Sequence, residues 1–288
     1  MNGSDLLTRA LATPNFVPAV TPVEEHDGVL VKRDDAWCRG GASGAKARAL
    51  FTVAADSAGI ISAGARISPQ LERAALVARH LGIPARLHTG HGSDTAETAL
   101  AAAAGAVLIR YRPARMSVIR ARYRANAAEL EQLGWACVPF AMEHPTYLAQ
   151  VAEQAVHLPS RGIERIVVPV GSGITLAAVL RGLTTAGLTL PVLGVRVGGD
   201  AAPHLDRYAP DWQARATLVT SPSPYASTVP NKLGALSLDP HYEAKALPYL
   251  RPGDLLWTVG VRASALTEPP CPSLPAPGPR QVRSQRRS

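Results

Sequence analysis

Cysteine is scarce in this chain of 288 residues, which has three in all, at positions 38, 137 and 271. None of them belongs to a CxxC pair or to a His/Cys group with zinc-ligand spacing. We therefore expect free thiols in a reducing compartment and no metal site. This pattern excludes the disulfide-rich secreted domains and the zinc-binding modules.

Long hydrophobic runs are also missing. The apolar stretch RIVVPVGSG is far shorter than the roughly 20 residues that a membrane-spanning helix needs. The first residues, MNGSDLLTRALATPNF, include Asp5 and lack the apolar centre of a signal peptide. The sequence therefore predicts a cytoplasmic protein that does not associate with membranes.

Acidic residues are outnumbered by basic ones, and the net charge of +8 raises the question of nucleic-acid binding. Residues 263–288 hold four arginines and one glutamate, a net +3, and the remaining +5 is spread over 262 residues. The densest basic run, RYRPARMSVIRARYR at 110–124, has the spacing of a helix with a solvated basic face. A phosphate-contacting surface is the alternative. We expect no nucleic-acid partner.

Segments with strand and helix patterns alternate along the chain. Strands are expected at GVLVK, GIISAG, ARLHT, AVLIR, ACVPF, RIVVPV, VLGVRVG, ATLVT and DLLWTVG. One intervening helix should begin at Pro69 and end at Gly82, and another should have Asp94 as its N-cap and TAET as a capping box. Strands that are apolar on both faces are typical of parallel sheets covered by helices, so the predicted class is α/β with crossover connections.

The composition changes at Ala263. The last 26 residues contain six prolines and show no periodicity, which predicts a disordered Pro/Arg-rich tail over 263–288.

Two glycine-rich stretches are candidates for function. In VPVGSGITLAAVL a buried strand ends at Val170, and Gly171 and Gly173 allow a tight turn into a helix. Ligands of open α/β sheets lie at the carboxyl ends of strands, and the free amides of a helix N-terminus attract phosphate. The stretch lacks a Walker lysine and the full GxGxxG spacing, so a simple strand-to-helix turn is the alternative.

The other stretch, RGGASGAKARAL, places Lys46 at the start of a predicted helix. A cation is unfavourable there because the helix dipole is positive at that end. A solvated surface lysine is the simplest interpretation. The position is better explained if the amine is neutral or covalently bound, as in a Schiff base with an aldehyde cofactor.

Segments spread over most of the chain resemble one enzyme family. VKRDDAWCRGGASGAKARAL is similar to the lysine segment of pyridoxal-phosphate enzymes of the tryptophan-synthase-beta-like fold, called fold type II. SAGARISPQ, VPVGSGITLAAVL and LDPHYEAKAL resemble further segments of the aminocyclopropane-carboxylate deaminase and D-cysteine desulfhydrase branch, and of actinobacterial and phage members of the superfamily. The resemblance runs from Thr21 to Arg262. It is specific for fold and cofactor and weakly specific for substrate.

The resemblance implies a fold and a cofactor site. It implies two open, mainly parallel-sheet domains with helices on both faces: a larger one from 1–41 and 146–262, and a smaller one from 42–145. Lys46 would form the Schiff base with pyridoxal 5'-phosphate and carry the proton of the substrate carbon. The residues that would hold the phosphate are Gly171, Ser172, Gly173, Ile174 and Thr175.

Further roles implied by the resemblance concern the substrate, a small amino acid. Ser68 and Gln70, in the loop at a helix start, would bind its carboxylate. Glu243 would lie near the pyridine nitrogen. Ser68 and Tyr242 would join Lys46 as catalytic residues, and Tyr225 would contact the substrate.

Each of these roles has a structural alternative. Ser68 could simply cap the helix that starts at Pro69. Glu243 and Lys245 could be surface charges, and Tyr242 could be a packing residue. The Asp pair of KRDD is expected to order the loop before the lysine.

The sequence also departs from the family pattern. Ala45 precedes the lysine where the family has asparagine, and Pro69 replaces the asparagine of the substrate loop. Proline has no side-chain donor and no amide proton, which weakens the expectation of deaminase-like tuning of the cofactor ring.

The expected function is a pyridoxal-phosphate-dependent lyase or deaminase that acts on a small amino acid by elimination, with a homodimer expected from the resemblance. The alternatives are a cofactor-binding protein without turnover and, less favoured, a nucleic-acid-associated protein.

Overall fold

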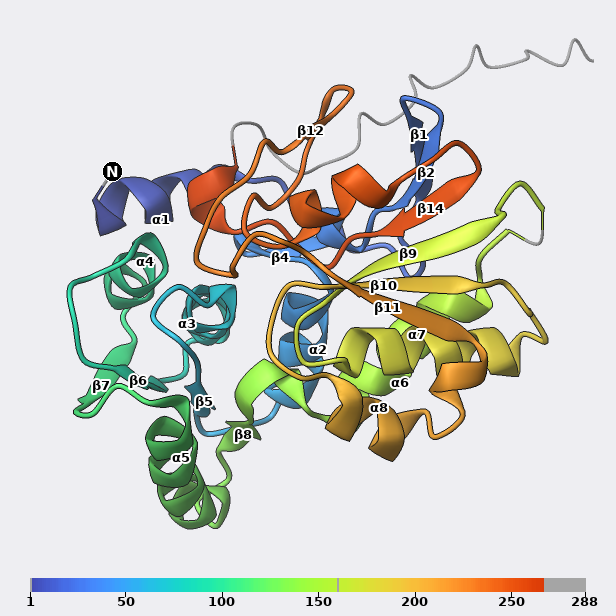
Figure 1. Cartoon of the computed structure of the whole chain (residues 1–288). Helices are drawn as coiled ribbons and strands as arrows, with labels where there is room; N and C mark the ends of the chain where they lie inside the picture. Colours follow the sequence, from blue (N-terminus) through green and yellow to red (C-terminus); the bar gives the residue numbers. More distant parts are fainter. Residues whose placement is uncertain (1, 160, 267–288) are drawn as a thin grey trace, which may run out of the picture.

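The computed structural model describes residues 2–159 and 161–266, which form two sheets with helices around them (Figure 1). The larger sheet has the strand order β1-β2-β14-β9-β10-β11, and only the β1–β2 pair is antiparallel. Its strands are β1 (Val23–His26), β2 (Val29–Lys32), β14 (Asp254–Trp257), β9 (Arg165–Val170), β10 (Val192–Arg196) and β11 (Ala216–Thr220).

The smaller sheet is entirely parallel, with the order β7-β6-β5-β8. Its strands are β5 (Ile60–Ala63), β6 (Ala85–Gly90), β7 (Val107–Tyr111) and β8 (Ala136–Val138). Two short hairpins complete the strands, β3 (Cys38–Arg39) with β4 (Ala42–Ser43) and β12 (Lys232–Leu233) with β13 (Leu236–Ser237).

Helices cover the sheets and supply most of the core. In Figure 1, α6 and α7 lie beneath β9 and β10, while α3 and α5 lie on opposite sides of β5. The α-helices are α1 (Gly3–Ala12), α2 (Ala45–Val53), α3 (Pro69–Leu81), α4 (Ala96–Ala103), α5 (Met116–Glu131), α6 (Pro145–Val156), α7 (Ile174–Thr185) and α8 (Ala202–Tyr208). The 3-10 turns are η1 (Asp34–Ala36), η2 (Phe140–Met142), η3 (Trp212–Ala214), η4 (Glu243–Tyr249) and η5 (Ala263–Ala265).

Capping residues in the sequence mark the ends of helices α3 and α4 closely. Helix α3 has Pro69 as its first residue and ends at Gly82, which adopts the left-handed conformation that glycine tolerates. For α4 the capping box TAET is present, but the N-cap is Thr95 rather than the expected Asp94. Asp94 instead accepts a hydrogen bond from the Thr98 hydroxyl, at 3.0 Å.

The basic run 110–124 is only partly helical, contrary to expectation. Its first two residues end strand β7, and helix α5 begins at Met116. Helix α5 buries Ile119 and Tyr123 against the small sheet and exposes Arg122 and Arg124. The basic face is therefore the solvent-facing side of an amphipathic helix.

The folded part of the chain extends slightly beyond Ala263, the predicted start of the tail. Residues 263–266 belong to the fold, because Ala263 and Leu266 are buried and the backbone amide of Ala263 donates to Glu72. The rest of the predicted tail, 267–288, lies outside the described residues. Among the helices that are described, none is both long and apolar enough to cross a membrane.

Candidate functional site

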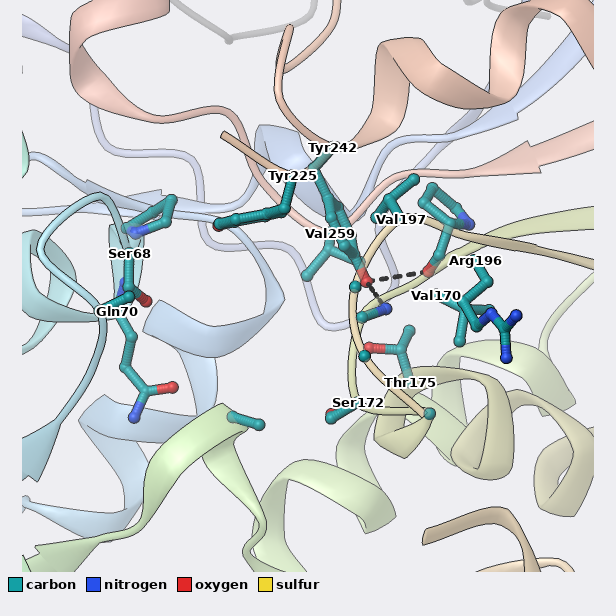
Figure 2. Close-up of a pocket in the computed structure, with 18 of the residues that line it drawn as sticks. Ser68, Gln70, Val170, Ser172, Thr175, Arg196, Val197, Tyr225, Tyr242 and Val259 are labelled. Carbon is teal, nitrogen blue, oxygen red and sulfur yellow. Dashed lines mark hydrogen bonds between the residues drawn. The ribbon is translucent and has the colours of Figure 1, made fainter. Parts of the chain in front are cut away.

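A cavity of about 790 Å³ opens where the carboxyl ends of the large-sheet strands face the amino-terminal end of α3. This volume suits a small-molecule ligand. Figure 2 shows Ser68 and Gln70 on one side of the cavity and Ser172, Thr175 and Tyr242 on the other, with Tyr225 between them. Of the sequence-predicted site residues, the cavity wall includes Lys46, Ser68, Gln70, Gly171, Ser172, Gly173, Thr175, Tyr225 and Tyr242.

Lys46 occupies the first turn of α2 because the preceding loop is held against the segment that follows β14. Gly44 has φ +91°, and a Cβ there would lie 2.4 Å from the Val259 carbonyl oxygen. The next amide, of Ala45, donates to that same carbonyl at 2.8 Å. A glycine is required for this close approach, so the GGASGAK spacing sets where the lysine emerges.

The KRDD segment orders the same region, as expected. Asp34 is fully buried and accepts hydrogen bonds from Arg48, at 3.0 Å, and from the Thr21 hydroxyl, at 2.7 Å. Asp35 accepts from the Thr258 hydroxyl just after β14. Since Arg48 is on α2, the Asp34 ion pair anchors the helix that carries Lys46.

The electrostatic environment makes the Lys46 amine unusually nucleophilic. Burial, and next the positive charge of Arg73, lower the pKa of Lys46 to about 8, while Glu243 opposes the shift. Within residues 2–159 and 161–266 no side chain or carbonyl forms a hydrogen bond or ion pair with this amine. At pH 7 about a tenth of such amines are uncharged, against less than about a thousandth of ordinary lysines. The amine is thus poised to attack a carbonyl group.

The start of α7 lies in the same cavity wall as Lys46 and presents a row of unused backbone amides. Gly173 is the N-cap with φ +93°, and no side chain caps the helix. In the described part of the chain, the N–H groups of residues 172–176 find no acceptor. Free amides combined with the positive end of the helix dipole form an anion site. The Ile174 side chain lies in the core rather than in the cavity wall, so this residue can contribute only its amide.

Tyr242 holds the turn that leads from β9 into the free amides of α7. Its hydroxyl donates to the Pro169 carbonyl at 2.9 Å and accepts from the Gly171 amide at 2.9 Å (Figure 2). Burial raises the pKa of Tyr242 well above 10. This geometry is that of a positioning residue, and a direct action of the hydroxyl on a substrate stays a prediction.

Glu243 and Lys245 are not surface charges, because they are 0% and 2% exposed. The amides of Val259 and Gly260 both donate to Glu243 Oε1 at 3.0 Å, whereas buried Oε2 has no partner among the described residues. Burial, and next the charge of Asp239, raise the pKa of Glu243 to about 8. Glu243 itself is not part of the cavity wall, whereas the Val259 and Gly260 backbone that it holds is.

Most polar groups of the Ser68–Gln70 loop are already engaged within the fold. The Ser68 side chain caps α3 by accepting from the Gln70 amide at 3.4 Å, as the capping alternative predicted. The Gln70 side-chain amide donates to the Ser62 hydroxyl at 3.0 Å and to the Pro139 carbonyl at 2.8 Å. Gln70 therefore fastens α3 to the segment after β8, and its amide nitrogen has no donor left for a substrate.

Sequence reasoning missed two buried arginines in the cavity wall. Arg73, on α3, donates to the carbonyls of Ser43 and Val261 and has no carboxylate partner in the described ranges. Arg262, just after β14, is 2% exposed and pairs with Asp239 and other groups. The sequence did contain a signal for Arg262. It follows the apolar strand DLLWTVG, whose carboxyl end lies at the same edge of the sheet as the glycine turn.

Within the described ranges, no three His, Cys, Asp or Glu side chains are grouped so that they could hold a metal ion.

No protein-family model and no curated protein sequence matches the chain.

Solved structures do match it, at low sequence identity. An ACC deaminase homologue superposes with a TM-score of 0.72 and 21% identity, over 90% of this chain and 95% of that one. O-acetyl serine sulfhydrylase isoform 3 from Entamoeba histolytica matches with a TM-score of 0.61 and 15% identity, over 91% and 90%.

A third match, diaminopropionate ammonia lyase from Escherichia coli, was solved in complex with an aminoacrylate-PLP azomethine reaction intermediate. It superposes with a TM-score of 0.61 and 13% identity, over 91% of this chain and 89% of that one. These likenesses confirm the predicted α/β architecture: the chain has the fold of these enzymes, fold type II.

Proposed function

We propose that the protein is a pyridoxal-phosphate-dependent lyase or deaminase that acts on a small amino acid. The observation that carries this proposal is one cavity whose wall holds both a lysine with a lowered pKa and a row of free helix amides. An aldehyde that also carries a phosphate is the ligand that needs both groups. The fold shared with the ammonia lyase and the deaminase homologue supports the choice.

The residues present fit this cofactor. Amides 172–176 and the Ser172 hydroxyl would hold the phosphate, and Lys46 the aldehyde carbon. Glu243 lies behind the cavity wall, so its expected contact with the ring nitrogen stays a prediction. When bound, the cofactor supplies an electron sink that weakens bonds at the substrate α-carbon. The Lys46 amine is the base in the cavity with a pKa suited to removing the α-proton near neutral pH.

Product formation tests the proposal directly. Purified protein with added pyridoxal phosphate is incubated with D- and L-cysteine, D- and L-serine and aminocyclopropane carboxylate, and keto acid, ammonia and sulfide are measured. We expect one of these substrates to give stoichiometric keto acid and ammonia. If the cofactor binds and no amino acid changes its spectrum or is consumed, the protein binds the cofactor without turnover, and Pro69 in the substrate loop is the feature that favours this second candidate.

The pKa of Lys46 leads to a prediction about pH. Because only the uncharged amine reacts, the rate of reductive methylation of Lys46 by formaldehyde should rise about tenfold per pH unit up to about pH 8 and then level off. Peptide mass spectrometry reads this lysine and exposed Lys232 in the same sample. A rate at Lys46 that keeps rising steeply well above pH 8 would contradict the proposed environment of this lysine.

Gly173 should be essential for cofactor affinity. An alanine there adopts a strained φ of +93° and places its Cβ 2.9 Å from the Ala201 carbonyl oxygen. The strain of about 1–3 kcal/mol must be relieved by a shift of the turn that presents the α7 amides. We therefore expect roughly 10- to 100-fold weaker binding of pyridoxal phosphate, measured by absorbance titration.

Gly187, just beyond the other end of α7, is the matched control. It also has a positive φ, +68°, but a Cβ there meets nothing within 4 Å. Gly187→Ala should keep the cofactor affinity of the parent protein. Equal losses in the two variants would mean that the effect is general destabilisation of α7.

A further inference from the structure

Arg73 is a buried cation without a counter-ion. It is 4% exposed, and within the described residues it forms no ion pair with a carboxylate. Its Nε donates to the Ser43 carbonyl at 2.8 Å and its Nη2 to the Val261 carbonyl at 3.2 Å. Backbone carbonyls do not neutralise a charge, and buried charges in proteins are normally paired. An anionic ligand would supply the missing partner.

The third nitrogen of the guanidinium, Nη1, is the donor available to such a ligand. It forms no hydrogen bond within residues 2–159 and 161–266, and it is not among the fully buried side-chain atoms there that lack a partner. Arg73 belongs to the cavity wall. Because the two carbonyls fix the planar group through its other nitrogens, Nη1 is a positioned donor that a ligand in the cavity can reach.

Arg73 lies close to the Lys46 amine. After burial, its charge is the largest cause of the lowered pKa of Lys46. Arg73 also holds the loop before the lysine through the Ser43 carbonyl. Gly260 makes room for the guanidinium, because a Cβ there would lie 2.7 Å from Nη2. An anion bound to Arg73 would therefore lie near the amine that is proposed to bind the aldehyde.

The proposed cofactor carries an acidic oxygen beside its aldehyde. In pyridoxal phosphate, the ring carbon that bears the aldehyde has two substituted neighbours, one with the phosphate arm and one with a hydroxyl group. The phosphate is assigned to the α7 amides, and Figure 2 shows the start of α3, at Ser68 and Gln70, across the cavity from Ser172. The hydroxyl, on the side of the aldehyde away from the phosphate arm, is the anionic group left for α3 and its Arg73.

We propose that Arg73, through Nη1, binds the ring hydroxyl oxygen of the cofactor and is its counter-charge. The proposal rests on the proposed function for the identity of the cofactor. Pro69, one turn earlier on the same face of α3, has no donor to offer. A cationic donor on this oxygen adds a charge-assisted hydrogen bond to the contacts of the phosphate and of Lys46, and so contributes to cofactor affinity.

The test compares two ligands that differ only in this oxygen, pyridoxine 5'-phosphate and its 3-deoxy analogue. Neither has an aldehyde or a carboxylate, so a preference between them reports neither a bond to Lys46 nor the binding of a substrate carboxylate. Isothermal titration calorimetry on the cofactor-free protein gives both dissociation constants. The visible spectrum with pyridoxal phosphate is recorded on the same samples.

The variants are Arg73→Gln and Arg73→Met, which remove the charge with and without a polar replacement. The matched control is Arg120→Gln. Arg120 is also an arginine of the cavity wall without an ion pair in the described ranges, but it lies on α5 with its guanidinium over the Phe140 ring. Because each preference is a ratio of two affinities on one variant, general loosening of the site cancels.

The parent and Arg120→Gln should bind pyridoxine phosphate about 10- to 100-fold more tightly than the 3-deoxy analogue, because the analogue loses a charge-assisted hydrogen bond. The Arg73 variants should bind the two compounds about equally. A preference that is kept in either folded variant, or is absent from the parent, overturns the proposal.

The spectra separate this proposal from the proposed function. If pyridoxal phosphate gives no visible band but the preference depends on Arg73, the proposed function fails and the Arg73 contact stands. A band that forms in the parent without an Arg73-dependent preference supports the function and overturns the contact.

Discussion

Turnover should fall by at least about a thousandfold when Lys46 is replaced by methionine, since the variant loses both the group that attaches the cofactor and the base at the α-carbon. The amine is the cavity group with a pKa near 8. Steady-state kcat/KM for the amino acid substrate, with excess pyridoxal phosphate, measures the loss.

Lys32 provides a matched control for this variant. Burial lowers its pKa to about 8 as well, but its Nζ donates to the Thr21 carbonyl and to Gln154 Oε1, and it is not part of the cavity wall. Lys32→Met should retain turnover in the fraction of protein that folds. More than a tenth of the parental kcat/KM in Lys46→Met would contradict the assigned role.

The free energy of unfolding should drop by about 3–5 kcal/mol in Asp34→Ala, because the variant leaves the guanidinium of Arg48 buried without its carboxylate. Asp34 is 0% exposed and also accepts from the Thr21 hydroxyl. The same loss should loosen α2 and with it the position of Lys46. Urea unfolding followed by far-UV circular dichroism measures the change.

A surface ion pair gives the contrast. Arg207, with a 68% exposed side chain, pairs with Glu143 at 3.1 Å. Arg207→Ala should cost less than about 1 kcal/mol. If Asp34→Ala is as mild as Arg207→Ala, the KRDD segment does not anchor the lysine helix.

Much of the fold could be predicted because its signals are local. Alternating apolar strands and helices predicted parallel sheets, and Pro69 and Gly82 marked the two ends of α3. The glycines of VGSGIT predicted the turn after β9, where Gly173 takes a positive φ. Each of these features depends on residues a few positions apart, so it can be predicted from local sequence patterns.

Long-range contacts could not be predicted in the same way. Arg262 meets Glu97 across 165 positions of sequence, and the engagement of the Tyr242 hydroxyl depends on a turn 71 positions away. Residue type also does not show whether a polar group is already satisfied. Gln70 was expected to bind substrate, yet its amide nitrogen is used by Ser62 and Pro139.

The central claim, that Lys46 binds an aldehyde cofactor whose phosphate lies on the α7 amides, is tested most directly by trapping the complex. The parent, Lys46→Met and Lys32→Met are mixed with pyridoxal phosphate, their visible spectra are recorded, and the samples are reduced with borohydride and mapped by peptide mass spectrometry. The account predicts a visible band and a pyridoxyl group on Lys46 in the parent and Lys32→Met, and neither in Lys46→Met. A parent protein without the band, or with the label on another lysine, would contradict it.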